Sequence, residues 1–372
     1  MPYTAMVSLE HFYYGQLVHY GEPVDERRIV ARSANITEEM VSAANRYAML
    51  PTLPNTSMST WAVVRGGRNA PFIMVQSGIG AAGQEMRHLI FINGDTLRDL
   101  QGNLTLLTTL LDGQLPTFEM IANIQDPLDL ATENIRSIDQ QTDDILTLMS
   151  LTGNNTRNLE PLLSAIVQGV PLVVINAPTS EQTRTQFVQG LITLLPPSTR
   201  FSVTFATYRQ REDGITAQIS FMDQAPEGDA LVYDWTDRSL SGTQTKDDYS
   251  HYITSQLRLD ISLALQQAEN LTQVAGWRFK SGDKLADALA YASKRQRLDD
   301  ALDHNMPVSM ADAGEVLGND PTLSPDLQYA YAEHLMNLGL AMDEMAQADS
   351  VAPLLKKDED IANLIAYLKA PN

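Results

Sequence analysis

The sequence predicts a multidomain protein that combines the α+β and α/β classes, and three observations lead to this prediction. Apolar runs typical of strands alternate with helical patterns as far as residue 240. Residues 171–208 read as a strand, a helix and a second strand, which is the pattern of a crossover unit. After residue 246 the strand patterns stop. We therefore expect a small N-terminal α+β domain (1–115), a middle α/β domain with a mixed sheet (116–240) and a C-terminal helical bundle (246–372).

The composition narrows the classes of protein and of partner. The 372 residues are 44% hydrophobic, which is typical of a folded chain, and they carry a formal net charge of −20. Because this charge repels phosphate groups, we expect no nucleic-acid partner. The chain has no cysteine, which excludes disulfides, thiolate metal sites and a cysteine nucleophile. Neither a signal-peptide pattern nor a run of about 18 apolar residues is present, so we expect a cytoplasmic protein that is not inserted in a membrane.

Strand patterns open the N-terminal region. Residues 4–14 alternate loosely, 28–33 form a second short strand pattern, and Gly15 and Gly21 supply turn signals. Asn35 or Thr37 can cap a helix that runs to about Tyr47. The later elements expected here are strands over Thr60–Arg65, Phe72–Gln76 and Arg87–Ile92, and a leucine-rich helix within Thr96–Leu111.

The middle region begins with helical patterns and continues into the crossover unit. Residues 116–170 look mostly helical, with the clearest helices over 142–151 and 158–168. The apolar run Leu172–Ile175 is typical of a strand that is covered on both faces. Thr179 and Gln182 form a capping-box pattern at the start of the next helix. Two prolines end that helix, and strands are expected over Phe201–Tyr208, Ala217–Met222 and Ala230–Trp235.

Beyond a polar linker expected at residues 239–248, all patterns are helical. The expected helices are Tyr249–Val274, Asp283–His304, Met310–Leu317, Asp326–Met345 and Asp358–Leu368. One of them carries an aromatic and aliphatic stripe made of Tyr329, Tyr331, Leu335, Leu338 and Met342. Packing inside the bundle is the simpler interpretation of this stripe. A partner-binding groove is the alternative, which the many methionines would suit.

Two sequence patterns bear on nucleotide binding, and neither predicts a bound cofactor. Gly78–Gly83 matches the dinucleotide fingerprint, but a strand pattern starts at Arg87, so the helix that must offer its amides to the pyrophosphate does not fit. We interpret the glycines as a hairpin loop. No phosphate-binding pattern of the Gly-x-x-x-x-Gly-Lys-Ser/Thr type is present, so we expect no P-loop nucleotide site in this chain.

Residues that often carry catalysis give no catalytic or metal-binding assignment. The histidines lie outside the paired spacings that bind zinc, and no serine lies in a Gly-x-Ser-x-Gly elbow. Acidic pairs such as Asp143-Asp144 are typical of solvated helix faces. Arg87-His88, beside the glycine loop, is the one place where a functional histidine is expected, the alternative being a histidine at the edge of a strand. Arg200 begins a strand pattern and is expected to neutralise a carboxylate or to bind a partner.

Three patterns together resemble the bacterial GTPase-associated protein family, over about residues 8–235. The junction Leu194–Thr207 is similar to the middle-region signature of that family, with Leu-Leu-Pro, an arginine and a strand that ends in Phe-Ala-Thr. Tyr14-Gly15 and Ala31-Arg32-Ser33 resemble its opening strands, and Gly83–Ile92 resembles a later glycine-then-histidine segment. The residues marked for binding on this basis are Tyr14, Gly15, Ser33, Arg87, His88 and Arg200.

The resemblance implies a non-catalytic adaptor or scaffold that acts with a small GTPase and other protein components of a bacterial conflict or signalling system. Two alternatives stay open at this point. The first is an enzyme with a site in the N-terminal domain near His88. The second is a structural subunit of a larger assembly.

Overall fold

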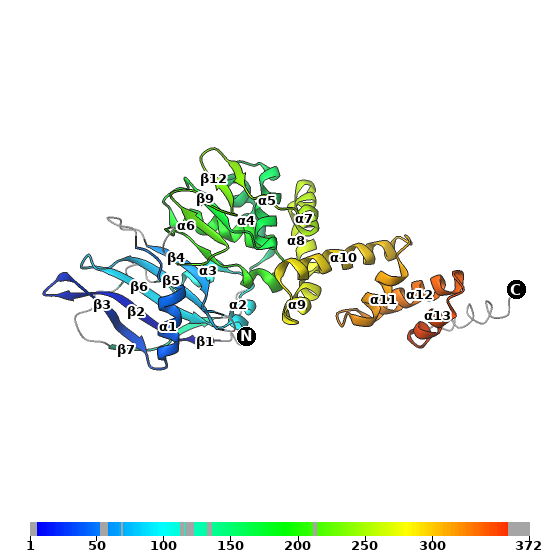
Figure 1. The fold of residues 1–372 in the computed structure, drawn as a ribbon, viewed down its shortest axis with the longest axis horizontal. Helices are drawn as coiled ribbons and strands as arrows, with labels where there is room; N and C mark the ends of the chain where they lie inside the picture. The colour runs from blue at the N-terminus through cyan, green and yellow to red at the C-terminus, as the bar shows by residue number, and fades with distance from the viewer. Residues whose placement is uncertain are drawn as a thin grey trace, which may run out of the picture. The chain divides into compact units, whose positions relative to one another are not determined.

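The computed structural model describes residues 6–52, 59–67, 70–111, 115, 123–131, 136–210 and 214–355. The chain divides into two compact units. The first unit is Met1–Thr272 with Lys284–Ala286, and the second unit is Gln273–Asp283 with Asp287–Asn372. The first unit is built from strands and helices, and the second from helices (Figure 1). The predicted mixed class with a helical C-terminal region is therefore confirmed.

The borders of these units differ from the expected domain borders. The expected N-terminal and middle domains share one sheet, because β4 (Thr60–Arg65) pairs with β10 (Phe205–Ala206). Helix α7 (Asp248–Leu259) belongs to the first unit, although its sequence placed it in the C-terminal domain. Its Tyr249 hydroxyl donates to the carbonyl of Leu194 at 2.7 Å. Pairing and packing between distant segments thus join regions that look separate along the sequence.

Among the described residues, eleven strands form one mixed sheet in the order β13-β12-β9-β11-β10-β4-β5-β6-β2-β3-β7. The four strands β12, β9, β11 and β10 run parallel, and those from β4 to β3 pair antiparallel. Strands β1 and β8 form a separate pair. The remaining bounds are β1 Met6–Leu9, β2 His11–His19, β3 Glu22–Ser33, β5 Phe72–Ile79, β6 Glu85–Ile92, β7 Asn123–Gln125, β8 Leu128–Ala131, β9 Leu172–Ile175, β11 Ile219–Met222, β12 Leu231–Asp234 and β13 Ser239–Gly242.

The helices of the first unit begin at polar caps. Thr37 Oγ1 accepts the backbone N–H of Met40 at the start of α1, and Ser137 forms a capping box with Gln140 at the start of α4. The bounds are α1 Glu38–Tyr47, α2 Gly94–Asp99, α3 Leu104–Thr108, α4 Ile138–Leu151, α5 Thr156–Gln168, α6 Glu181–Thr193 and α8 Ile261–Asn270, with a 3₁₀ helix η1 at Pro197–Ser202.

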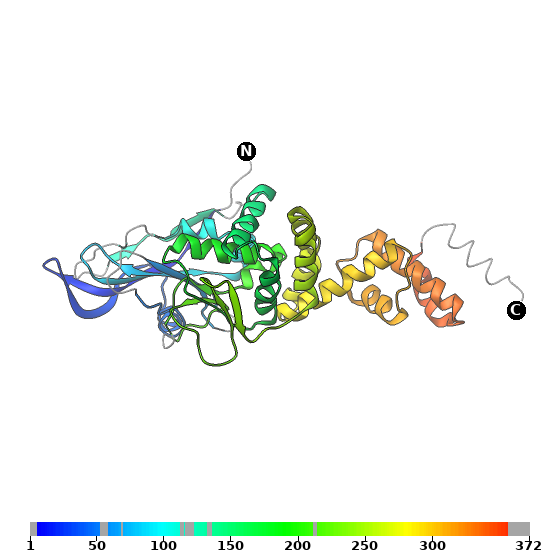
Figure 2. The same cartoon turned by 90° about the horizontal axis from the view of Figure 1, so that it is seen from above.

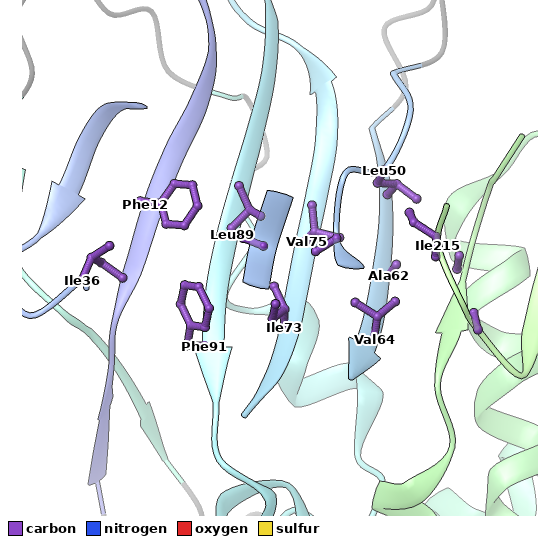
Figure 3. Close-up of a cluster of buried hydrophobic side chains, with 14 residues drawn as sticks. Phe12, Ile36, Leu50, Ala62, Val64, Ile73, Val75, Leu89, Phe91 and Ile215 are labelled. Atoms are coloured by element: carbon purple, nitrogen blue, oxygen red, sulfur yellow. The ribbon is translucent and has the colours of Figure 1, made fainter. Parts of the chain in front are cut away.

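Helices cover both faces of the large sheet. Helix α1 lies on one face, and α4, α5 and α6 lie on the opposite side, as the two views show (Figures 1 and 2). The α1 face holds an apolar core that runs across β2, β6, β5 and β4 to Ala206 of β10. Its labelled members in Figure 3 are Phe12, Ile36, Leu50, Ala62, Val64, Ile73, Val75, Leu89, Phe91 and Ile215. On the other face, Phe187 of α6 packs against the rings of Phe221 and Tyr233 at centroid distances of 5.9 and 5.8 Å.

Several local predictions are wrong, and each has a physical reason. The strand expected over Phe201–Tyr208 is shorter, because the 3₁₀ helix η1 precedes β10. Pro197 at its first position has no N–H to leave unpaired. The cap of α6 is Ser180 and not Thr179, since Ser180 Oγ accepts the N–H of Thr183 at 3.2 Å. Gly15 lies inside β2, because the chain turns instead at Tyr20 and Gly21, both with positive φ.

Two further differences concern connecting segments. Residues 116–170, expected to be mostly helical, contain the strands β7 and β8. The linker expected at 239–248 starts as β13, which pairs antiparallel with β12. Strands β7 and β8 form because they pair with distant strands, β7 with β3 and β8 with β1, whereas β13 forms a local hairpin with the preceding strand β12.

The remaining helices are α9 Thr272–Lys280, α10 Leu285–Asp303, α11 Met310–Asn319, α12 Pro325–Ala341 and α13 Met345–Val351, with a short 3₁₀ helix η2 at Ala352–Leu354. All of their residues belong to the second unit except Thr272, Leu285 and Ala286, which belong to the first. The core of the second unit contains Tyr331 and Leu335 of the predicted stripe, so packing accounts for that part of the pattern. Met342 is exposed. The helix expected over Asp358–Leu368 lies outside the described residues. In the described part of the chain, every helix is too short or too polar to span a bilayer.

Candidate functional site

His88, the histidine singled out by the sequence, forms a buried pair with His11. Strand β6 carries His88 and the adjacent strand β2 carries His11. The atoms His88 Nε2 and His11 Nδ1 lie 2.8 Å apart, and His11 Nε2 lies 2.9 Å from the carbonyl oxygen of Asp126. The ring of Tyr13 stacks on His88 at a centroid distance of 4.2 Å. Only 1% of His88 and 2% of His11 is exposed, so neither ring is open to a substrate in solution.

The carbonyl of Asp126 fixes where the protons of this pair lie when both rings are neutral. A carbonyl oxygen only accepts, so the proton of His11 must be on Nε2. The unprotonated Nδ1 of His11 then accepts, and His88 must donate from Nε2. The two imidazoles therefore form a directed chain of hydrogen bonds that joins β6, β2 and the segment before β8. Such a chain orients the strands and the segment that covers them.

Ser33 reaches this pair through the backbone of His11. Its Oγ accepts the N–H of His11 at 2.9 Å and donates to the carboxylate of Glu10. Asn35 Nδ2 also donates to Glu10, at 2.8 Å. Burial alone would raise the pKa of Glu10, but the hydrogen bonds from Ser33 and Asn35 outweigh it and lower the pKa. Glu10 is thus held as a carboxylate that ties the end of β3 to β2.

Tyr14 and Arg87 lie next to each other on the face opposite His88. They are register partners on β2 and β6, and Arg87 Nε donates to the carbonyl of Leu50 at 2.7 Å. Burial lowers the pKa of Arg87. Gly15 follows Tyr14 where the two strands approach closely, since a Cβ there would lie 2.3 Å from the carbonyl oxygen of Glu85. These residues therefore serve strand pairing and the core under α1.

Arg200 is buried in a different part of the unit and holds the end of α6. Its Nε donates to the carbonyl of Leu195 at 2.8 Å, and its Nη2 donates to the carbonyl of Thr193 at 2.9 Å and to Gln141 Oε1 at 3.0 Å. Burial lowers its pKa to about 10, a value at which the guanidinium is still charged at neutral pH. Carbonyls at a helix end need such donors. The structure thus gives Arg200 a capping role, and the carboxylates of Asp144 on α4 and Glu269 on α8 also favour its positive charge.

The carboxyl ends of the parallel strands form a polar edge that the sequence reasoning missed. Asn176 follows β9 and donates from Nδ2 to Asp234 Oδ2 at 2.8 Å, at the end of β12. Asp223 follows β11 and accepts the hydroxyl of Tyr208 at 3.0 Å. In open α/β sheets ligands bind outside this edge. The sequence did contain a signal for this edge, namely polar residues placed directly after strands that are buried.

Two side chains of α6 occupy the place at this edge where a nucleotide phosphate would approach. Arg184 donates from Nε to the carbonyl of Pro178 and from Nη1 to the carbonyl of Thr207, each at 2.7 Å. Glu181 stands in the first turn of α6, and Ser59 Oγ donates to its carboxylate at 2.9 Å. Burial raises the pKa of Glu181, although Ser59 opposes the shift. The loop carbonyls turned to Arg184 and the adjacent carboxylate disfavour a phosphate at this helix end.

The structure therefore brings His88 and Ser33 together through His11, places Tyr14 beside Arg87, and gives Arg200 separate partners. In the part of the chain that the structure describes, no cluster of three or more histidine or acidic side chains is arranged to hold a metal ion. No protein-family model and no curated protein matches the chain.

Proposed function

We propose that the chain is a non-catalytic adaptor that holds other proteins together, a small GTPase among them, in a bacterial conflict or signalling system. The GTPase enters through the resemblance of Leu194–Thr207 and of the N-terminal patterns to the GTPase-associated family. A cytoplasmic location goes with the proposal, because a small GTPase draws on the cytoplasmic pool of GTP. The net charge of −20 favours basic surfaces on the partners.

The observation that carries the non-catalytic part of the proposal is the internal use of the marked side chains. His88 and Arg200 are both buried, and both are bonded to groups of the same chain. A catalytic base must instead reach the proton that it abstracts from the substrate. The burial of the histidine pair therefore supports a structural role for His88 over the enzyme alternative.

An affinity purification of the full chain from its native host tests the proposal. The bound proteins are eluted and identified by mass spectrometry, once with a non-hydrolysable GTP analogue and once with GDP. We expect a small GTPase in the eluate, in amounts that differ between the two nucleotides. An unrelated protein of the same size and charge is the control bait, because a strongly acidic surface collects basic proteins. Absence of any GTPase from both eluates would contradict the proposal. The mass of the intact complex, measured by native mass spectrometry, distinguishes an adaptor from a structural subunit, because a structural subunit should be found in a large assembly of fixed mass.

A further inference from the structure

A groove of about 390 Å³ lies on the second unit between the end of α10 and the middle of α12. Leu302, Met306 and Pro307 form its apolar side, and Met306 is 57% exposed, so its side chain is open to contact by a partner. Ala330 and Glu333 line it from α12. A space of this size accepts one or two anchoring side chains. The groove therefore combines an apolar wall with a carboxylate.

The face of α12 that lines the groove is set by helical spacing. Ala330, Glu333, His334 and Asn337 follow the pattern i, i+3, i+4 and i+7, which places them on one stripe. The opposite stripe, represented by Tyr331, is buried in the core of the unit. His334 Nε2 lies 3.0 Å from the carbonyl oxygen of Val308, so the turn after α10 is tied to α12. The two walls of the groove are thus held together by the fold.

The segment that forms this groove is acidic. Residues 298–355 contain eleven Asp or Glu residues and no Lys or Arg, so they form a continuous acidic segment. The neighbouring cations of α10 neutralise four of the carboxylates: Arg295 binds Asp299 and Asp320, and Lys294 binds Asp312 and Glu315. The other seven are exposed, except for half-buried Glu333 in the groove. Their field attracts a positively charged segment and repels an acidic one.

We infer that this groove docks a basic amphipathic segment of a partner protein. One or two apolar side chains of the segment enter beside Met306, and its Lys or Arg residues pair with Glu333 and the surrounding carboxylates. Helix-in-groove recognition has this form, and an exposed methionine adapts to the anchor that it receives. The inference rests on the proposed adaptor function and names the chemistry of its partner.

Fluorescence anisotropy with labelled peptides and the full chain tests the inference. The probe is an amphipathic peptide of leucine and lysine about 18 residues long, which makes about five helical turns. One comparison peptide has glutamate in place of lysine, and another has the same composition without an apolar face. We expect the leucine–lysine peptide to bind at least about tenfold more tightly than either comparison peptide. Equal binding of the acidic peptide, or no binding of the basic one, would overturn the inference.

Two matched variants locate the binding on the groove. Glu333→Gln removes the carboxylate in the groove with little change in shape, and Glu344→Gln removes the same group from the exposed start of α13. We expect Glu333→Gln to weaken the basic peptide about threefold to tenfold and Glu344→Gln to change it less than about twofold. Equal effects of the two variants would show that the peptide is held by a general charge attraction, and would overturn the inference that it binds in the groove. Circular dichroism confirms that both variants are folded.

The peptide and GTPase experiments fail independently. Recovery of a GTPase without binding of the basic peptide overturns the groove inference and leaves the adaptor proposal standing. Binding of the peptide in the groove without recovery of any GTPase supports the groove inference and contradicts the adaptor proposal.

Discussion

The second unit is predicted to depend on one buried arginine. Arg295 on α10 binds Asp320 at the end of α11 and Asp299 on its own helix, with the Nε–Oδ1 distance to Asp299 at 2.8 Å. The side chain of Arg295 is 3% exposed and that of Asp320 is 0% exposed, so water cannot replace either partner. Arg295→Met keeps much of the aliphatic volume and removes the guanidinium. Both carboxylates then lose their cation inside the unit.

The expected loss of unfolding free energy is about 3 kcal/mol, at the low end of the range of about 3–5 kcal/mol for a broken buried ion pair. The low end applies because each carboxylate keeps other donors. Asp299 accepts the hydroxyl of Tyr331 at 2.8 Å, and Asp320 accepts the N–H and hydroxyl of Thr322 at 2.8 and 2.6 Å. Burial raises the pKa of Asp299 even with Arg295 present, so its ionised form depends on that arginine.

Hydrogen exchange measured by mass spectrometry gives the direct assay. Peptides from α11 and α12 should lose protection in Arg295→Met, and peptides from β5 and β6 in the first unit should keep theirs. Arg297→Met on the same helix is the matched control, because Arg297 is exposed and its loss should change stability by less than about 0.5 kcal/mol. Combining Arg295→Met with Asp320→Asn should restore part of the loss. An effect below about 1 kcal/mol, or an equal loss of protection in β5 and β6, would refute the reasoning.

Three further predictions concern the first unit. His88→Ala leaves His11 Nδ1 without its donor and should lower the unfolding free energy, measured by urea titration, by about 1–3 kcal/mol. His19→Ala is the control because His19 is exposed, and an equal loss of unfolding free energy in the two variants would contradict the prediction. Burial raises the pKa of Asp144 to about 6, although Arg136 opposes the shift. The folded state therefore holds this proton more tightly than the unfolded state does, and the unfolding free energy should fall by about 1–2 kcal/mol, with solvent screening allowed for, as the pH rises from about 4 to 6. Asp144→Asn should flatten that dependence of Tm on pH, and an unchanged slope would exclude Asp144 as its source. Gly15→Ala places a Cβ 2.3 Å from the carbonyl of Glu85 and should cost about 1–3 kcal/mol, measured by thermal unfolding; a change below about 0.5 kcal/mol would show that the strands separate freely there.

Elements with local signals were predictable from the sequence. The run Leu172–Ile175 is a strand with the predicted ends, because continuous β-branched and apolar residues suit a strand whose two faces are both buried. Helix α1 begins after Thr37, one of the two predicted caps, since the capping bond to Met40 lies within four residues. In both cases the physical cause is contained in the segment itself.

Features that depend on distant partners were not predictable. Arg200 looked like the start of a strand, but it donates to the carbonyls of Thr193 and Leu195 at the end of α6 and to Gln141, 59 residues earlier. The pairing of His88 with His11 follows from the register of β6 on β2, which joins positions 77 residues apart. Neither histidine has a local pattern that reveals its partner. The pairing of β4 with β10 is of the same kind, because it joins a strand of the N-terminal region to one of the middle region and neither strand has a local pattern that reveals it.

The central claim is that this chain acts by binding a GTPase. Isothermal titration of the purified full chain with the small GTPase that its purification recovers tests it most directly, once with a non-hydrolysable GTP analogue bound and once with GDP. The account predicts a saturable complex whose Kd differs between the two nucleotide states, with no GTP hydrolysis by the chain alone. Absence of binding in both states, or hydrolysis of GTP by the chain alone, would contradict it.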